Sequence, residues 1–282
     1  MVGQRGATRS VRIQRFRDGQ GEGARDAVAV EEPLEMRIAW AEGGGPRKAE
    51  AVAVTMRTPG DDFELVAGFL FGEGLVPSPQ LIHELTYCRG DEAQHYNVVE
   101  ARLRAGVPFD PSVLRRNFYA SSSCGVCGKA SLESVDALGC APLPDGFVVP
   151  GSLVAGLPAA LAEGQGAFRR TGGLHAAGIF DAGGSCLVCR EDVGRHNAVD
   201  KAVGHLFLRR ALPGAERVLV VSGRASFEIV QKTVAAGIPI LVAVGAPSSL
   251  AVELAHTFNM TLLGFTRAEG FNIYAGAERV AG

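Results

Sequence analysis

The chain has 282 residues, enough for one large domain or two domains of medium size. Its 28 lysines and arginines nearly balance 30 acidic residues, and this net charge of −2 argues against a general nucleic-acid binder, which needs a basic face. Hydrophobic residues make up 47%, as is typical of a globular protein, and six cysteines are too few for a small disulfide-stabilised scaffold. Glycine is unusually frequent, with 37 residues, about twice its usual share.

The N-terminal residues 1–26 are polar, rich in glycine and arginine, and lack the apolar core of a secretory signal. We therefore predict a flexible basic arm. The 20 uncharged residues 233–252 contain Gly237, Pro239 and Pro247 among their breaks, which a membrane-spanning helix does not tolerate together. We expect a cytoplasmic protein with no membrane partner and with reduced thiols.

Residues 27–120 are predicted to form a smaller mixed α+β domain. Segments that alternate or run apolar at strand length are 28–40 and 51–57, separated by a glycine-rich turn at 43–46. A helix is predicted to begin with Thr58 as its N-cap and Pro59 as its first residue, and to end near Gly72.

Residues 121–282 are predicted to form a larger domain in which strands alternate with helices of 10–15 residues. The predicted strands are 175–181, 186–191, 217–221, 238–246, 261–266 and 271–274. The predicted helices are 151–170, 197–210, 224–236 and 248–258. This alternation indicates an α/β unit whose sheet is of the parallel type and covered by helices on both faces, within a chain that is α+β overall.

The sharpest chemical motif is Cys124-Gly125-Val126-Cys127, which small residues surround. Two thiols at this spacing can share a metal, form a disulfide or pass a sulfur atom between them, and nearby Lys129 can stabilise a thiolate. A second pair, Cys186 and Cys189, lies in a predicted strand, where positions i and i+3 point to opposite faces. We therefore interpret the second pair as structural and predict no metal site.

Anion-binding features occur where predicted strands end and helices begin. The segment 190–201 places Arg195 and His196 near a helix N-terminus, for which Asn197 is the predicted N-cap. Backbone N–H groups, the helix dipole and an arginine together form a natural anion site, although a capped helix with solvated charges fits the same residues. His175, at the start of a strand, can be a ligand, a base or a structural histidine.

Two later junctions repeat this pattern. Ser222, Gly223 and Arg224 follow one buried strand, with Ser222 as the predicted N-cap, and Ser248 follows the next. Three such junctions in one sheet would line one edge, which suggests a sizeable ligand that carries phosphate groups. The chain has no G-x-G-x-x-G and no G-x4-G-K-[ST] motif, so a dinucleotide site of the Rossmann type or a P-loop is unsupported.

These motifs form an ordered series that resembles the formate dehydrogenase accessory sulfurtransferase family, FdhD/NarQ. The segments that carry the resemblance are 31–35, 58–64, 68–74, 124–129, 171–175, 190–201, 222–228, 246–249 and 264–267. They extend over most of the chain, and as a series they are far more specific than the C-x-x-C motif alone.

The resemblance implies a fold, an activity and partners. The larger domain is expected to have the cytidine deaminase fold, as an α/β/α unit. The protein is expected to take sulfur from a cysteine desulfurase as a persulfide and to pass it to the molybdenum bis-guanine-dinucleotide cofactor (Mo-bis-MGD), before that cofactor enters formate dehydrogenase. A homodimer is expected, since the cofactor has two identical halves, and GDP is the natural fragment with which to mimic one half.

The resemblance also implies roles for particular residues. Cys124 corresponds to the persulfide cysteine and Cys127 to its partner thiol. The cofactor-binding segment corresponds to Phe265, Thr266, Arg267, Ala268, Glu269 and Gly270. Family members often have glycine followed by a second basic residue in this turn, whereas this chain has Glu269-Gly270-Phe271.

Two other functions remain open from the residues themselves. One is a non-catalytic binding protein stabilised by zinc, and the other is a thiol–disulfide oxidoreductase that uses the C-x-x-C motif. Zinc-dependent deamination is disfavoured, because no proline precedes Cys124 and no glutamate follows His175 at the second position.

Overall fold

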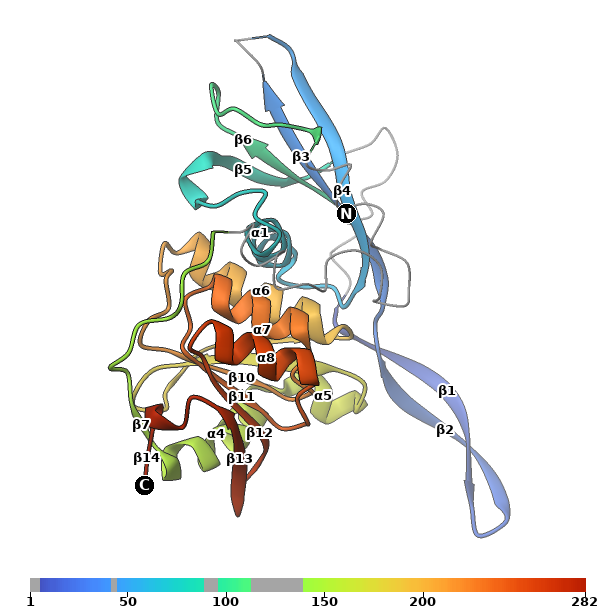
Figure 1. The fold of residues 1–282 in the computed structure, drawn as a ribbon. Helices are drawn as coiled ribbons and strands as arrows, with labels where there is room; N and C mark the ends of the chain where they lie inside the picture. The colour runs from blue at the N-terminus through green and yellow to red at the C-terminus, as the bar shows by residue number, and fades with distance from the viewer. Residues whose placement is uncertain (1–5, 42–44, 89–95, 113–138) are drawn as a thin grey trace.

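Two β-sheets lie on opposite sides of a helical layer in the computed structural model, which describes residues 6–41, 45–88, 96–112 and 139–282 (Figure 1). The larger sheet has six strands in the order β13-β12-β11-β10-β8-β9. Their bounds are β8 His175–Phe180, β9 Cys186–Asp192, β10 Val218–Val221, β11 Ile240–Ala243, β12 Thr261–Arg267 and β13 Gly270–Ala275.

The larger sheet is mixed rather than parallel throughout. Strands β10, β11 and β12 pair in parallel, whereas β8, β9 and β13 join through antiparallel pairs. The predicted hairpin of β8 and β9 is confirmed. A hairpin at each side of a parallel centre explains why the strands alternate with helices only in the middle of this domain.

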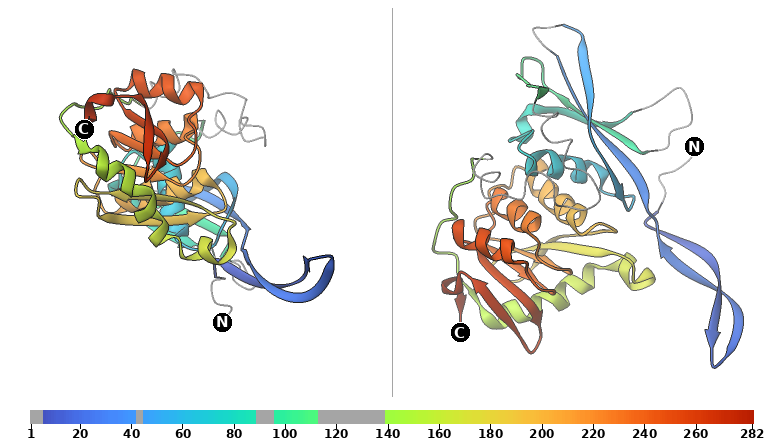
Figure 2. Two further views of the ribbon diagram at one scale, coloured as in Figure 1. Left: turned by 90° about the horizontal axis from the view of Figure 1, so that it is seen from below. Right: turned by 45° about the vertical axis from the view of Figure 1, so that its right-hand side comes forward.

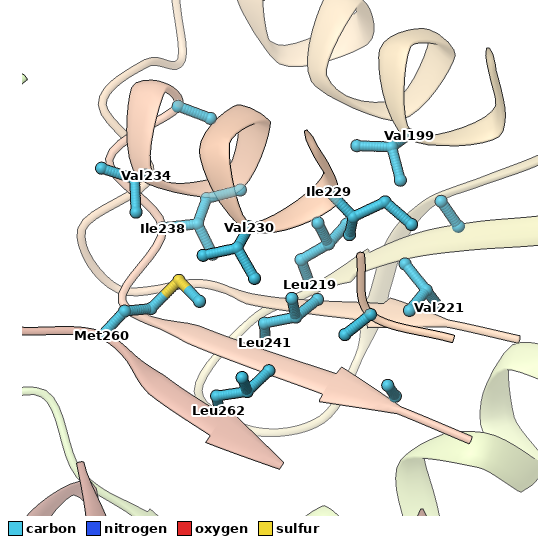
Figure 3. Packing of buried hydrophobic residues seen from close by; sticks show 14 of the residues in the cluster. Val199, Leu219, Val221, Ile229, Val230, Val234, Ile238, Leu241, Met260 and Leu262 are labelled. Atoms are coloured by element: carbon cyan, nitrogen blue, oxygen red, sulfur yellow. The ribbon is translucent and has the colours of Figure 1, made fainter. Parts of the chain in front are cut away.

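Helices cover both faces of the larger sheet, as predicted, and give an α/β/α arrangement (Figure 1). One face carries α6 Arg195–Leu208, α7 Phe227–Ala235 and α8 Ser249–Thr257, and the other carries α4 Gly151–Gly164. Strand β10 shows the physical reason: Leu219 and Val221 pack among the first three helices (Figure 3), whereas Val218 and Val220 pack under α4. An uninterrupted apolar run therefore forms a strand that is buried on both sides.

The single helix predicted for residues 151–170 is wrong, because the structure has two helices. Helix α4 ends at Gly164, and α5 (Gly166–Thr171) follows after Gln165. The carboxylate of Glu191 accepts hydrogen bonds from the backbone N–H groups of Ala167 and Phe168, at 2.8 and 2.6 Å. Glu191 on β9 thus pairs with the free N–H groups at the start of α5. The local sequence pattern alone predicts that the first helix continues through this point.

The smaller sheet has the order β4-β3-β6-β5 and packs against helix α1. These elements are β3 Glu32–Ala41, β4 Arg47–Arg57, α1 Asp62–Gly72, β5 Ile82–Tyr87 and β6 Val98–Leu103. Alternate residues of β3, from Leu34 to Trp40, enter the core shared with α1, in agreement with the predicted strand. Among the described residues, the short elements are η1 Pro79–Leu81, β7 Val149–Pro150, η3 Ala277–Arg279 and β14 Val280–Ala281.

Helix α1 lies between the smaller sheet and α6 (Figure 1), and two glycines allow its close approach to α6. A Cβ atom added to Gly68 would lie 1.9 Å from the carbonyl oxygen of Asp200, and one added to Gly204 would lie 1.9 Å from that of Glu64. The two backbones therefore touch at this crossing. The domain boundary that we expect near residue 120 lies outside the described residues.

Residues 1–26, for which we predict a flexible basic arm, contain most of a regular β-hairpin in their described part. Strands β1 (Thr8–Arg17) and β2 (Gln20–Ala29) pair over their whole length and project from the body as a ribbon (Figures 1 and 2). Asp18 and Gly19 have φ angles of 50° and 79°, as a tight hairpin turn requires. Apolar and polar residues alternate from Val11 to Gln14, and this short period of two, followed by the Asp18-Gly19 turn, is the local signal for a hairpin.

Candidate functional site at the edge of the larger sheet

The carboxyl ends of β9, β10, β11 and β12 lie along one edge of the larger sheet. The pairing of the strands gives all four the same direction, and the amino end of β8 joins them, since His175 pairs with Asp192. The three predicted junctions, after β9, β10 and β11, are thus brought together at this edge.

The loops after β10 and β11 have the same structure, 22 residues apart in the chain. The N–H of Gly245 donates to the carbonyl of Gly223 at 2.9 Å, and Ala225 forms an isolated parallel bridge with Pro247. The N–H of Phe265 donates in turn to the carbonyl of Gly245 at 3.1 Å. Backbone hydrogen bonds therefore link the three neighbouring loops side by side.

The N-cap predicted at Ser222 is wrong, whereas Ser248, for which no such role was predicted, is an N-cap. Ser248 caps α8, since its Oγ accepts from the N–H of Ala251 at 3.3 Å. Ser222 does not cap α7; its Oγ accepts from the N–H of Ala176 at 2.9 Å and ties the loop to β8. The N-cap of α7 is Ser226, because the chain continues past Arg224 through the bridge to Pro247 before the helix begins.

Arg195 is the first residue of α6 and lies against the loop after β10. A Cβ atom added to Gly223 would lie 4.0 Å from Cδ of Arg195 and 3.4 Å from Nδ1 of His175, so this glycine lets both side chains approach the backbone. The Nε of Arg195 is buried and has no hydrogen-bond partner in the described part of the chain. Burial, assisted by the Arg195 charge, lowers the pKa of His175 and favours its neutral form.

His196 faces the N-terminus of α7. Its Nε2 lies 3.0 Å from Oγ of Ser226 and 3.2 Å from a carboxylate oxygen of Glu228. Burial outweighs the nearby carboxylate and lowers the pKa of His196 to about 4. The edge therefore combines two neutral imidazoles with a permanently charged guanidinium, an arrangement suited to an anionic ligand.

Asn197 is not the N-cap of α6, because the helix begins two residues earlier, after Gly194. Asn197 is buried, and its Nδ2 donates to the carbonyl of Met56 at 2.8 Å and to Oδ1 of Asp192 at 3.0 Å. The same Asp192 oxygen accepts from the N–H of Gly194 at 2.9 Å. The Asp192 carboxylate at the end of β9 thus holds the turn before α6, a role that we predicted for Asn197 as the N-cap.

Asp192 also joins the two halves of the chain. Its carboxylate lies 2.7 Å from Nζ of Lys201, and both side chains are fully buried. It accepts from the N–H of Thr58 at 3.1 Å, while Oγ1 of Thr58 accepts from the N–H of Val193 at 3.2 Å. Thr58 is consequently a link between loops rather than the N-cap of α1, which begins at Asp62.

The segment 265–270 forms the outer end of the β12–β13 hairpin, whose turn extends past the neighbouring strands (Figure 1). Phe265 has a φ angle of 52° in an irregular stretch of β12, and its side chain is 46% exposed. Thr266 is fully buried, with an Oγ1 that lacks a partner among the described residues. The exposed residues on this edge include Arg224, Arg267, Ala268 and Glu269.

Of the two cysteine pairs singled out in the sequence, the structure describes only Cys186 and Cys189. Cys124 and Cys127 lie outside the described residues, so their roles stay predictions. Cys186 is exposed and Cys189 half-buried on β9, and burial raises the pKa of Cys189 to about 12. Such a thiol is protonated and unreactive at neutral pH.

Sequence reasoning missed the contacts that hold the edge in shape. These contacts are the network of Thr58, Asp192, Asn197 and Lys201 and the crossing of Gly68 with Gly204, and all of these residues except Gly204 fall in the segments on which the family resemblance rests. Their presence in these segments was the one feature of the sequence that could have indicated a structural role for them. Over the described ranges, no three His, Cys, Asp or Glu side chains gather as metal ligands, and no helix is long and apolar enough to span a membrane.

Comparison with known proteins identifies the family. A model of the FdhD/NarQ family matches residues 29–281. The chain belongs to the FdhD/NarQ family. The sulfur carrier protein FdhD of Mycolicibacterium paratuberculosis is 48% identical over 273 residues, covering 95% of this chain and 97% of that protein. That of Streptomyces coelicolor is 48% identical over 275 residues, covering 96% and 94%.

The fold is also similar to that of a solved structure. A crystal structure from Desulfotalea psychrophila, assigned as a formate dehydrogenase accessory protein, aligns with a TM-score of 0.74 and 24% identity, covering 98% of this chain and all of that one. The FdhD/NarQ match includes both sheets and the candidate edge, and it begins at the last residue of the β1–β2 ribbon.

Proposed function

We propose that this protein is a sulfur carrier that takes sulfur from a cysteine desulfurase and delivers it to Mo-bis-MGD for a formate dehydrogenase. Cys124 holds the sulfur as a persulfide, Cys127 is its partner thiol, and the cofactor binds at the sheet edge. The buried, unpartnered Nε of Arg195, beside Gly223 at this edge, is the observation that carries the cofactor site. The proposed roles of Cys124 and Cys127 rest on membership of the family, whose relatives at 48% identity are named sulfur carrier proteins.

The residues of the edge fit a guanine dinucleotide. Its phosphates would meet Arg195 and the first turns of α6 and α8, where the helix dipoles favour anions. Neutral His175 and His196 can share hydrogen bonds with such a ligand. The exposed ring of Phe265 offers a stacking surface for a base, and Arg224 and Arg267 add positive charge at the rim.

The thiols can load and release sulfur with balanced electrons. The Cys124 thiolate attacks the terminal sulfur of the desulfurase persulfide, forming a new S–S bond as the desulfurase thiolate leaves. Attack by Cys127 on Cys124 then expels the outer sulfur as hydrosulfide and leaves a disulfide, so that the two thiols supply the two electrons. Both steps need reduced thiols at the start, and we therefore place the protein in the cytoplasm.

Mass spectrometry tests the sulfur carrier. After incubation with a cysteine desulfurase and cysteine, the peptide containing Cys124 should carry one added sulfur atom. The variant Cys124→Ser should lose this modification, and Cys186→Ser, which removes an exposed thiol on β9, should keep it. Sulfur found elsewhere, or retained in Cys124→Ser, would rule out Cys124 as the carrier.

Binding of GDP tests the cofactor edge separately. We expect Arg195→Met to weaken GDP binding about tenfold or more, as measured by calorimetry, because a buried charge-assisted contact is lost. The control is Arg217→Met, which removes an arginine just before the amino end of β10, at the opposite edge of the sheet. Equal GDP affinity in wild type and Arg195→Met would reject this edge as the site.

A further inference from the structure

A β-bulge brings Cys186 and Cys189 onto the same face of the larger sheet. Positions three apart normally point to opposite faces of a strand, which is why the sequence argues against a shared role for this pair. In the pairing of β8 with β9, however, the register shifts between Ile179 and Phe180, and Leu187 is left as an extra residue on β9. The extra residue restores the alternation, so the two thiols lie side by side along one face.

That face is the one that helix α4 covers. Cys186 lies opposite Phe180 and Cys189 lies opposite Gly178, and residues directly opposite each other in a sheet share a face. Phe180 is buried in the core under α4, and Cys189 packs against the same core. Sγ of Cys189 lies 3.9 Å from the carbonyl oxygen of Leu161 on α4. Cys186 is exposed, so the pair is open to solvent at one end.

The spacing of the two thiols suits a bridging ion better than a disulfide. The step from Cys186 to Cys189 spans only two residues of β8, about 6.8 Å. The Cβ atoms of a disulfide lie about 3.5–4.5 Å apart, so an S–S bond would require the strand to move. Two metal–sulfur bonds of about 2.3 Å place the sulfur atoms up to about 4.6 Å apart, and the Cβ–S bonds cover the rest. A metal ion can therefore join the pair without distorting β9.

The ligand set selects the kind of ion. Thiolate sulfur prefers soft cations, of which Cu(I) and Zn²⁺ are the common ones in proteins. Zn²⁺ takes four ligands in its structural sites, whereas no group of three His, Cys, Asp or Glu side chains is found among the residues that the structure describes. Cu(I) is stable between two thiolates alone. We propose that Cys186 and Cys189 form a two-sulfur site for Cu(I).

The surroundings of Cys189 favour a thiolate that shares its charge with a cation. Burial, assisted by Cys186 and the Glu191 carboxylate, raises the pKa of Cys189 and opposes a bare thiolate. The carboxyl end of α4, where the helix dipole is negative, lies directly over this thiol: a Cβ atom added to Gly164 would lie 2.7 Å from its Sγ. Binding exchanges two thiol protons for one Cu(I) with no change of oxidation state. The exposed Cys186 leaves the ion open to exchange with a thiolate of another protein.

Titration with Cu(I) tests this site in the full chain. The parent protein is Cys124→Ser/Cys127→Ser, in which the proposed sulfur-carrying thiols cannot contribute. With the chelator bathocuproine disulfonate as competitor, we expect the parent to bind one Cu(I) per chain. Adding Cys186→Ser, at an exposed position, should weaken binding about a hundredfold or more, because one of two sulfur ligands is lost. Adding Cys88→Ser instead removes a half-buried thiol directly after β5 and should leave the affinity unchanged.

X-ray absorption at the copper edge identifies the ligands directly. Copper bound to the parent should have two sulfur neighbours and no nitrogen or oxygen ligand. A parent that loses all its copper to the chelator would overturn the proposal, as would equal affinity in the parent and the Cys186→Ser variant, or a copper ion held by nitrogen or oxygen. A disulfide between Cys186 and Cys189 that forms in air in the metal-free protein would contradict the spacing and reject the site.

Discussion

Single atoms decide the contact between the two halves of the molecule. Gly68 and Gly204 face each other's helices at distances that exclude a Cβ atom, since each hypothetical Cβ falls 1.9 Å from a backbone carbonyl oxygen. A flexible side chain could move aside, but a helix backbone cannot. The glycines here serve close packing and not unusual φ angles.

Gly204→Ala should therefore destabilise the protein by about 3 kcal/mol, because α1 and α6 must separate to admit a methyl group. Urea unfolding monitored by circular dichroism measures the change. Gly156→Ala is the matched control: Gly156 lies in α4 with nothing within 4 Å of an added Cβ, so alanine should stabilise the protein by about 0.5–1 kcal/mol. Equal effects of the two changes would contradict the close crossing.

His196 makes the stability of the folded protein depend on pH. Burial lowers its pKa to about 4 in the folded protein, below the value of about 6.5 in the unfolded chain. Between these values the unfolded chain binds more protons, so stability falls as the pH decreases from about 6.5 toward 4. His196→Gln should lose less stability than wild type between pH 7 and pH 4.5 in urea titrations. Parallel pH curves for the two proteins would show that His196 contributes nothing to this response.

At the scale of elements, the loops after β4 and β9 act as one unit. Thr58, Asp192 and Lys201 interlock through buried hydrogen bonds and an ion pair, and Arg190 on β9 binds the Glu64 carboxylate of α1. The edge residues Arg195 and His196 follow directly after this junction. The smaller sheet and α1 therefore help to hold the candidate site in place.

Lys201→Met should lower the free energy of unfolding by about 3–5 kcal/mol, since it leaves the Asp192 carboxylate buried without its cation. The comparison is Arg102→Met on β6, whose pairs with Glu84 and Glu100 are partly exposed and should be worth less than about 1 kcal/mol. Chemical denaturation of both variants measures the difference. Similar losses would mean that the Asp192–Lys201 pair is not the buried link described above.

At the scale of the whole molecule, the two cores are continuous. Phe207 of α6 belongs to the core of the smaller sheet, and Phe71 and Leu212 pack against the cores of both sheets. Two units that share side chains and a helix crossing should unfold together.

This continuity predicts a single unfolding transition. Trp40, the one tryptophan of the chain, is buried in the smaller sheet, so its fluorescence reports on that unit. Circular dichroism at 222 nm is dominated by helices, most of which lie on the larger sheet. The two signals should give the same urea midpoint for wild type. Separate midpoints would show that the two units unfold independently.

Local patterns predicted much of the fold. The buried strands β10 and β11, the β8–β9 hairpin and the helices on the larger sheet follow from apolar runs and helical spacing. The ribbon was not predicted, because the polar composition of residues 1–26, rich in glycine and arginine, indicates a flexible arm, whereas the Asp18-Gly19 turn is a weak local signal for a hairpin. Of the candidate site, the meeting of three strand-end loops at one edge was predictable, because strands in one direction place their carboxyl ends together.

The sequence by itself determined most strands and helices of the larger sheet and which residues could bind an anion, because periodicity and strand-to-helix junctions are local properties. Only the tertiary structure decided where α1, α6 and α7 begin, which histidines are neutral and how the smaller sheet is held. Those features depend on partners far apart in the chain, such as Asp192 with Thr58 and Glu228 with His196. Burial and long-range hydrogen bonds set them, and neither can be read from neighbouring residues alone.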